Sequence, residues 1–150
     1  MSEERATGVP APDFSILSGV RFIASPNCDE RPEGAAIELL VLHNISLPPG
    51  QFGGDGVIQF FTNCLDPRAH PYYQSIAHLK VSSHFFLRRD GELVQFVPCS
   101  MRAWHAGVSC WRGRERCNDF SIGVELEGCD DRPYTDEQYH VLAGLTQELK

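Results

Sequence analysis

The chain has 150 residues, 42% of them hydrophobic, and a formal net charge of −7 at pH 7. This length predicts one domain with a single core, and an acidic chain without a basic run is a poor partner for nucleic acid. No apolar stretch approaches membrane-spanning length, and the acidic N-terminus lacks the apolar region of a secretory signal. We therefore expect a cytoplasmic protein with no membrane partner. Its six cysteines have neither C-x-x-C nor zinc-finger spacing, which predicts reduced thiols.

In chain order, the sequence begins with a segment that has no clear periodicity. Residues 1–21 are expected to form a partly disordered N-terminal lead-in, followed by the domain at residues 22–150. Residues 14–27 are interpreted as an irregular or edge segment. The pattern of a regular strand starts only after these residues.

The first clear strand carries a histidine. Residues 38–46 read E-L-L-V-L-H-N-I-S, an apolar run in which Leu39, Val41 and His43 share one face. Residues 47–54 contain two prolines and three glycines, which predict a loop. A loop at the end of a strand is a common place for a functional site.

A short helix is predicted after this loop. Asp55 or Gly54 can cap its N-terminus. Its apolar side consists of Val57, Ile58, Phe60 and Phe61. Asp-Pro at 66–67 and His-Pro at 70–71 are expected to break the stretch that follows.

Residues 81–97 give the clearest local pattern, because two alternating apolar runs flank Asp90-Gly91. This dipeptide favours a hairpin turn of type I′. The expected alternation places Val81, Phe85 and Leu87 on one face and Ser82 and His84 on the other. Residues 98–118 are predicted to form a long loop.

A second apolar strand is predicted at residues 120–128 and includes S-I-G-V-E-L-E-G. Its apolar face consists of Ile122, Val124 and Leu126, and Glu125 points the other way. A metal-ligand side chain on one strand and an acid/base side chain on another form the layout of a hydrolytic site on a sheet. Single residues such as His43 and Glu125 are nevertheless common on strands.

The last predicted element is a helix that opens with the capping-box pattern T-D-E-Q at 135–138. Its expected buried face consists of Tyr139, Leu142, Ala143, Leu145 and Leu149. Strands dispersed among helices, with one antiparallel hairpin, predict an α/β (α+β) fold in which a mixed β-sheet is flanked by helices.

Six separate motifs then point to one family. They are V-L-H-N-I-S-L-P-P-G-Q-F-G-G, H-P-Y, S-S-H-F-F-L-R-R-D-G, R-A-W-H-A-G, G-R-E-R-C-N-D-F-S-I-G-V-E-L-E-G and Y-T-D-E-Q-Y. In this order they resemble the AmpD-type N-acetylmuramoyl-L-alanine amidases, from about residue 22 to the last residue. The resemblance implies the mixed sheet of the type 2 amidases and peptidoglycan recognition proteins. It also implies a bacterial cytoplasmic zinc enzyme that recycles muropeptides.

The resemblance assigns roles to individual residues. His43 matches the family's first zinc ligand, with a satisfied strand histidine as the alternative. Glu125 matches the catalytic glutamate, which would take a proton from water and pass it to the leaving amine. The alternatives are a carboxylate paired with an arginine on the sheet, or Glu127 as the catalytic group.

Four further positions match residues that line the family's substrate groove. They are Asn44, Tyr72, Trp104 and Arg116. An aromatic side chain suits a sugar or lactyl face, and an arginine suits a peptide carboxylate; each could instead serve packing or a surface ion pair. Lys80 is interpreted as a solvated lysine, and His84 and His105 as structural hydrogen-bonding residues.

The sequence departs from the family at its end. In the family a second histidine and an aspartate complete the zinc site after the final helix, whereas this sequence ends inside that helix at Lys150. The C-terminal part is therefore expected to be missing, with the remaining ligands beyond Lys150. His43 alone cannot hold zinc tightly, because catalytic sites normally supply three ligands. A fragment and a decayed scaffold both remain possible explanations.

The predicted function is zinc-dependent hydrolysis of the amide between the lactyl group of (anhydro-)N-acetylmuramic acid and L-alanine. The alternative is a non-catalytic muropeptide-binding module, since the later zinc ligands are absent. Either function implies a small muropeptide as partner, and we expect a monomer.

Overall fold

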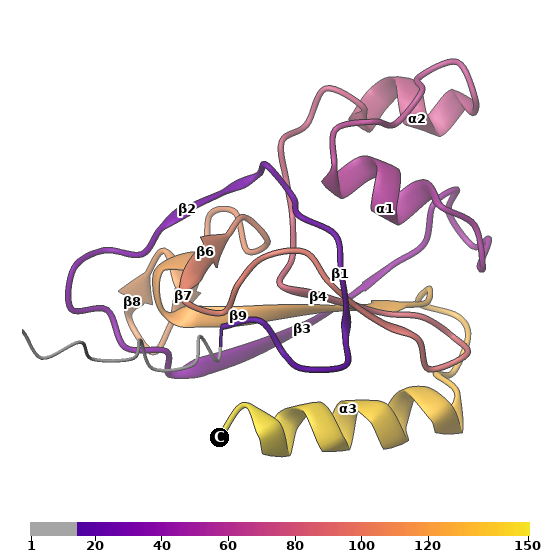
Figure 1. The fold of residues 1–150 in the computed structure, drawn as a ribbon. Coiled ribbons are helices and arrows are strands. Elements are labelled where there is room, and N and C mark those ends of the chain that lie inside the picture. Colours follow the sequence, from indigo (N-terminus) through magenta and orange to yellow (C-terminus); the bar gives the residue numbers. More distant parts are fainter. Residues whose placement is uncertain (1–14) are drawn as a thin grey trace, which may run out of the picture.

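The computed structural model describes residues 15–150, whose centre is a five-stranded mixed sheet (Figure 1). In spatial order its strands are β1 (Arg21–Phe22), β5 (Leu93–Gln95), β4 (Phe85–Leu87), β9 (Ser121–Glu127) and β3 (Leu39–Ile45). β9 is parallel to both of its neighbours, β4 and β3, whereas β4 and β5 are antiparallel. The two strands expected to carry the site are therefore adjacent. Most of the expected N-terminal lead-in lies outside the described residues.

The predicted long loop at residues 98–118 contains short strands. β6 (Met101–Ala103) pairs with β2 (Cys28–Glu30), and β7 (Cys110–Trp111) pairs with β8 (Arg114–Glu115). A 3₁₀ helix, η1 (Cys117–Phe120), leads into β9. Strands of two or three residues are too short to show a readable period, which explains why the sequence did not reveal them.

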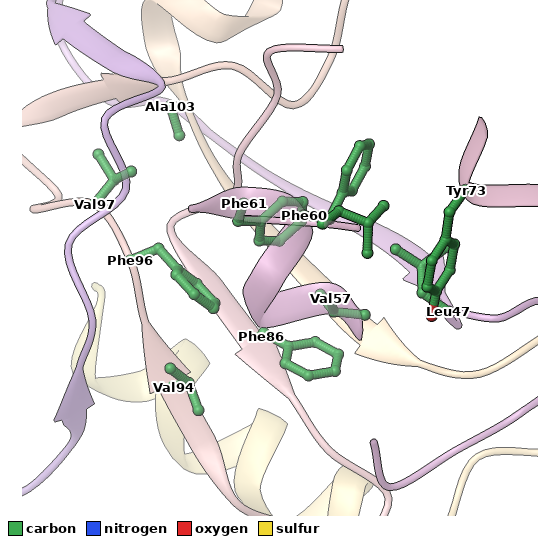
Figure 2. Close-up of a cluster of buried hydrophobic side chains, with 11 residues drawn as sticks. Leu47, Val57, Phe60, Phe61, Tyr73, Phe86, Val94, Phe96, Val97 and Ala103 are labelled. Carbon is green, nitrogen blue, oxygen red and sulfur yellow. The ribbon is translucent and has the colours of Figure 1, made fainter. Parts of the chain in front are cut away.

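Helices cover both faces of the sheet, as the sequence predicts. α1 (Gly56–Phe61) and α2 (Pro71–Ile76) lie on one side and α3 (Asp136–Glu148) lies on the other (Figure 1). Two buried clusters fill the spaces between these layers. The cluster beside α1 is shown in Figure 2 and includes Leu47, Val57, Phe60, Phe61, Tyr73, Phe86 and Phe96. The cluster beneath α3 includes Phe85, Leu87, Ile122, Val124, Leu126 and Leu145.

The helix after the loop forms as predicted, and the stretch after it is broken up to His70, but the sequence did not reveal that Pro71 begins a second helix. Pro71 is the first residue of α2, and the side chain of His70 accepts a hydrogen bond from the Tyr72 backbone nitrogen at 3.1 Å. Proline is tolerated at this position because the first N–H groups of a helix have no partner within the helix. The His-Pro pair therefore starts a helix here.

The predicted hairpin is present as β4 and β5, with a different turn. Gly91 has a φ of +90°, but Asp90 is not among the residues with positive φ, whereas type I′ requires positive φ at both central positions. The Gly91 N–H donates instead to the Arg88 carbonyl at 3.0 Å. The expected face of Val81 is also wrong. Val81 precedes β4 and packs against the α1 cluster, whereas Phe85 belongs to the α3 cluster.

The capping box of α3 is confirmed. Thr135 Oγ1 accepts from the Gln138 backbone nitrogen at 3.1 Å, and the Gln138 side chain accepts from the Thr135 backbone nitrogen at 3.0 Å. Three residues of the expected buried face, Leu142, Leu145 and Leu149, do pack in the α3 cluster. Tyr139 and Ala143 are exposed, so this part of the prediction is wrong.

The side chain of Gln138 explains this difference. It is fully buried, and its Nε2 donates to the Leu87 and Glu127 carbonyls at 3.2 and 2.9 Å. These bonds turn the face with Gln138 and Val141 towards the sheet. α3 is 13 residues long, and no described helix combines the length and hydropathy that crossing a bilayer demands.

Candidate active site

The sheet places the predicted metal ligand, His43, next to the predicted catalytic residue, Glu125. In the parallel pairing of β3 with β9, His43 is the register partner of Glu125. Register partners on neighbouring strands present their side chains on the same face. This face is opposite to the one that packs on α3, because Val124 and Leu126 belong to the α3 cluster. The alternation predicted for both strands is thus present.

Glu125 has a buried carboxyl group with one oxygen unpaired among residues 15–150. The residue is 9% exposed, and its Oε2 has no hydrogen-bond partner among the described residues. Burial raises the pKa of Glu125 to about 8. A carboxyl group that titrates near neutral pH can both accept and donate a proton during one reaction cycle. The alternative reading of a sheet carboxylate paired with an arginine has no support, since no described arginine forms an ion pair with Glu125.

Glu127 differs from Glu125 although it lies on the same face of β9. Its carboxylate accepts hydrogen bonds from the backbone nitrogens of Gly53 at 2.7 Å and Arg89 at 3.0 Å. These bonds attach two loops to the end of the strand. Its carboxylate oxygens are thus engaged in holding structure, and Glu125 remains the better candidate for proton transfer.

His43 is held by a second histidine. Its Nε2 lies 2.9 Å from His105 Nδ1, and His105 Nε2 lies 3.0 Å from Ser121 Oγ. Burial lowers the pKa of His43, and burial together with the neighbouring histidines lowers that of His105 to about 3. Both rings are therefore neutral at pH 7. With Nε2 engaged, Nδ1 is the nitrogen of His43 for which no hydrogen bond is found within residues 15–150.

A glycine in β9 makes room for this arrangement. A Cβ atom at Gly123 would lie 2.5 to 2.7 Å from atoms of the His105 ring. His84 also binds this glycine, since its Nδ1 accepts from the Gly123 N–H at 3.1 Å. Burial lowers the pKa of His84 to about 4. His84 and His105 thus form hydrogen bonds within the structure, as expected, but sequence reasoning missed that His105 contacts His43. The signal was Gly123, because a glycine inside a strand often marks a close approach.

The four expected substrate residues fall into two groups. Asn44 and Tyr72 line a groove of about 530 Å³ between the end of β3, the helices α1 and α2, and residues 128–130. Asn44 Nδ2 donates to Asp130 Oδ1 at 3.1 Å. Trp104 and Arg116 do not line this groove. Trp104 directly precedes His105, and Arg116 lies in a second hollow beside β7 and β8.

A complete zinc centre is not found in the described part of the chain. No group of three or more histidine, cysteine, aspartate or glutamate side chains in residues 15–150 is arranged to hold a metal ion. His43 fits as one ligand, because a neutral imidazole fixed by a neighbouring hydrogen bond is a good donor. The six cysteines are free thiols and do not enlarge this donor set.

Comparison with known proteins places this site in a family. A family model described as N-acetylmuramoyl-L-alanine amidase matches residues 33–150. The 1,6-anhydro-N-acetylmuramyl-L-alanine amidase AmpD of Escherichia coli (strain K12) is 59% identical over 133 residues, which cover 89% of this chain and 73% of that protein.

Solved structures agree with the sequence match. The crystal structure of a selenomethionine AmpD derivative is similar with a TM-score of 0.88 and 58% identity, covering 90% of this chain and 75% of that one. The E. coli amidase AmiD, in complex with the substrate anhydro-N-acetylmuramic acid-L-Ala-D-gamma-Glu-L-Lys, has a TM-score of 0.50 and 25% identity. It covers 80% of this chain and 46% of that one. The mixed-sheet fold class is thereby confirmed. The chain belongs to the N-acetylmuramoyl-L-alanine amidase family and is a hydrolase of the amidase class.

Proposed function

We propose that this chain hydrolyses the amide bond between the lactyl group of 1,6-anhydro-N-acetylmuramic acid and L-alanine. The reaction would serve peptidoglycan recycling in the cytoplasm and would depend on zinc. The observation that carries the proposal is the buried carboxyl group of Glu125, which is in register with His43 and whose Oε2 has no partner in the described part of the chain. The 59% identity to a relative named for this activity supports the choice of substrate.

Glu125 would move the proton in this reaction. As water attacks the lactyl carbonyl carbon, the Glu125 carboxylate takes one of its protons. The same carboxyl group then gives that proton to the amide nitrogen as the carbon–nitrogen bond breaks, which leaves a lactyl carboxylate and a free L-alanine amine. A pKa raised by burial favours this second step, because the group then holds a proton near neutral pH.

His43 would be one ligand of the metal. When bound, zinc supplies a Lewis acid for the carbonyl and lowers the pKa of its water. His105 would keep the ring of His43 in one orientation through their 2.9 Å contact. Because residues 15–150 supply a single fitting ligand of this kind, we expect the 150-residue chain to bind zinc weakly.

The remaining site residues would bind the muropeptide. Asn44 and Tyr72 would contact it in the groove at the end of β3. The ring of Trp104 would pack on an apolar face of the sugar or lactyl group. Arg116 would bind a carboxylate of the peptide stem.

The proposal is tested by incubating the chain with anhydro-N-acetylmuramyl tripeptide and identifying products by mass spectrometry. Zinc is supplied in excess in one arm and removed with a chelator in the other. We expect the free tripeptide to appear with zinc and its release to fall in the chelated arm. His43→Ala should weaken zinc binding in a metal titration and reduce hydrolysis together, whereas His140→Ala, on the exposed side of α3, should change neither.

A second candidate is a muropeptide-binding module that does not cleave its ligand. The observation that favours it is that the described residues contain no three-ligand metal cluster. The same assay separates the two, with calorimetry added to measure binding. A chain that binds the muropeptide but releases no tripeptide at any zinc concentration is a binding module. Stoichiometric zinc binding at submicromolar free metal, measured by equilibrium dialysis, would show that further side chains complete the site.

A further inference from the structure

Arg102 lies at the centre of an ion-pair network that the proposed reaction does not use. Its Nε and Nη2 donate to the two carboxylate oxygens of Asp29 at 2.7 and 2.6 Å. Its Nη1 donates to Asp119 Oδ1 at 2.5 Å. The side chains of Arg102 and Asp119 are each only 18% exposed. Such two-pronged, partly buried pairs are among the strongest polar contacts in proteins.

Each of these carboxylates also holds one residue of the expected substrate site. Asp29 Oδ1 accepts a hydrogen bond from the Trp104 indole nitrogen at 3.1 Å. Asp119 Oδ2 lies 3.4 Å from Arg116 Nε. Arg102 is thus connected to both Trp104 and Arg116 through one aspartate each.

The local fold explains why these groups meet. Asp29 on β2 is the register partner of Arg102 on β6, so the bidentate pair runs directly across the two strands. Trp104 follows two residues after Arg102, and side chains two apart along an extended chain point the same way. Arg116 adopts a left-handed backbone conformation with a φ of 60° immediately before η1, which contains Asp119.

The contacts with Asp29 and Asp119 each engage one nitrogen of Trp104 and Arg116, and the remaining atoms of both side chains can contact a ligand. The indole N–H of Trp104 is engaged, which orients the ring, and the residue is only partly buried. Arg116 forms an ion pair through Nε, 3.4 Å from Asp119 Oδ2, and its side chain is 72% exposed, so its two terminal nitrogens remain for a bidentate bond to a carboxylate. Asp119 is shared between two guanidinium groups and therefore does not fully neutralise Arg116.

We infer that Arg102 is a positioning residue for muropeptide binding, which holds Trp104 through Asp29 and Arg116 through Asp119. This inference rests on the proposed function, in which Trp104 and Arg116 contact the muropeptide. The strong bond to Arg102 is also the first cause of the lowered pKa of Asp29, so this carboxylate stays charged. Arg102 itself does not need to touch the ligand.

The test compares Arg102→Met with Arg21→Met, a matched loss of a strand arginine that forms one exposed ion pair with Glu92. In the ligand-free protein, NMR of the Trp104 indole N–H and the Arg116 Nε–H measures how firmly both groups are held. We expect faster hydrogen exchange at both sites in Arg102→Met and no change in Arg21→Met. Calorimetry with anhydro-N-acetylmuramyl tripeptide should show affinity reduced about ten- to a hundredfold in Arg102→Met alone.

A milder variant keeps the test valid if Arg102→Met does not fold. Asp119→Asn leaves the bidentate pair of Arg102 with Asp29 in place and weakens the hold on Arg116. It should reduce affinity for the tripeptide with free carboxylates, but not for the same tripeptide with its carboxylates amidated. A purely structural role of Asp119 would reduce both affinities equally.

The outcomes distinguish the two levels of the proposal. Unchanged exchange at Trp104 and Arg116 in Arg102→Met would overturn the positioning role, whatever the affinity. Faster exchange with unchanged affinity would show that Arg102 holds these groups but does not act on muropeptide binding, and would overturn the inference as well. Failure of the unmodified chain to bind the tripeptide would instead refute the proposed function, because the exchange measurement is made without ligand.

Discussion

The two faces of β9 are both buried, but one forms part of the hydrophobic core and the other carries the polar residues of the candidate site. On the side of α3, three apolar residues pack into one cluster: Ile122, Val124 and Leu126. The other face carries Ser121, Gly123, Glu125 and Glu127, and these residues are buried as well. Burial therefore does not distinguish the candidate catalytic residue from its neighbours. The distinguishing property is whether its polar atoms have hydrogen-bond partners. Glu127 is bonded to two backbone nitrogens, whereas Oε2 of Glu125 has no partner among the described residues.

The largest effect on stability is expected on the apolar face. Leu126 is 2% exposed, so Leu126→Ala should remove buried surface and leave a cavity. We expect the free energy of unfolding to fall by about 2–5 kcal/mol. Urea unfolding followed by circular dichroism measures this loss. A decrease below about 1 kcal/mol would mean that this face contributes little to the core.

On the polar face, the most damaging small change is expected at Gly123. In Gly123→Ala the new methyl group would lie within 2.7 Å of the His105 ring and push it away from His43. We expect a loss of about 1–3 kcal/mol in the free energy of unfolding, together with altered imidazole NMR signals of His43. Gly144→Ala on α3 is the control, since its Cβ would meet no atom within 4 Å. Gly144→Ala should stabilise α3 slightly, because alanine favours helix more than glycine does. Unshifted His43 signals in Gly123→Ala would contradict this description of the site.

The protonation of Glu125 should make stability depend on pH in the metal-free protein. Its pKa is about 8 in the folded state, against an ordinary value of 4.5. Between these two pH values the folded state holds one proton more than the unfolded state, so stability falls as pH rises, by at most about 1.4 kcal/mol per pH unit. Below pH 4.5 and above pH 8 this contribution to the slope vanishes.

Glu125→Gln removes this dependence and leaves the buried histidines unchanged. The difference in unfolding free energy between Glu125→Gln and the unmodified protein should therefore increase from pH 5 to pH 8 in favour of the variant. Urea unfolding at pH 5, 6.5 and 8 gives the difference directly. A difference that is constant with pH would show that the folded protein does not raise the pKa of Glu125.

The smallest effect is expected on the solvent side of α3. Ala143 is exposed although the apolar pattern suggested otherwise. Ala143→Gln should change the free energy of unfolding by no more than about 0.5 kcal/mol, whereas Leu145→Ala, at a position 3% exposed, should cost several times more. Thermal or urea unfolding of both variants checks the orientation of the helix.

Elements with a local signal could be predicted from the sequence. The alternation in β3 and β9 is long enough to identify their faces, and the Thr135 capping box marks the start of α3. The elements that could not be predicted lack such a signal. β2 and β6 have three residues each, and α2 starts at a proline that resembles a helix breaker. The rotation of α3 depends on Gln138, whose bonding partners Leu87 and Glu127 are distant in sequence.

The same distinction applies to the site. His43 and Glu125 were identified from their strands and motifs, but their pairing depends on a register that neither strand encodes alone. The contact of His43 with His105 spans 62 residues, and the network around Arg102 joins three separate segments. These contacts arise from tertiary packing between segments that are distant in sequence, so the local hydrophobic pattern cannot predict them.

We propose that Glu125, and not Glu127, transfers the proton. The most direct test is the rate of tripeptide release from anhydro-N-acetylmuramyl tripeptide by Glu125→Gln and Glu127→Gln, measured with excess zinc on folded protein. We expect Glu125→Gln to bind the muropeptide and to lose about 10²- to 10⁴-fold in rate, whereas Glu127→Gln should lose mainly stability. A Glu125→Gln variant that cleaves the muropeptide at the unmodified rate would show that Glu125 is a structural carboxyl group.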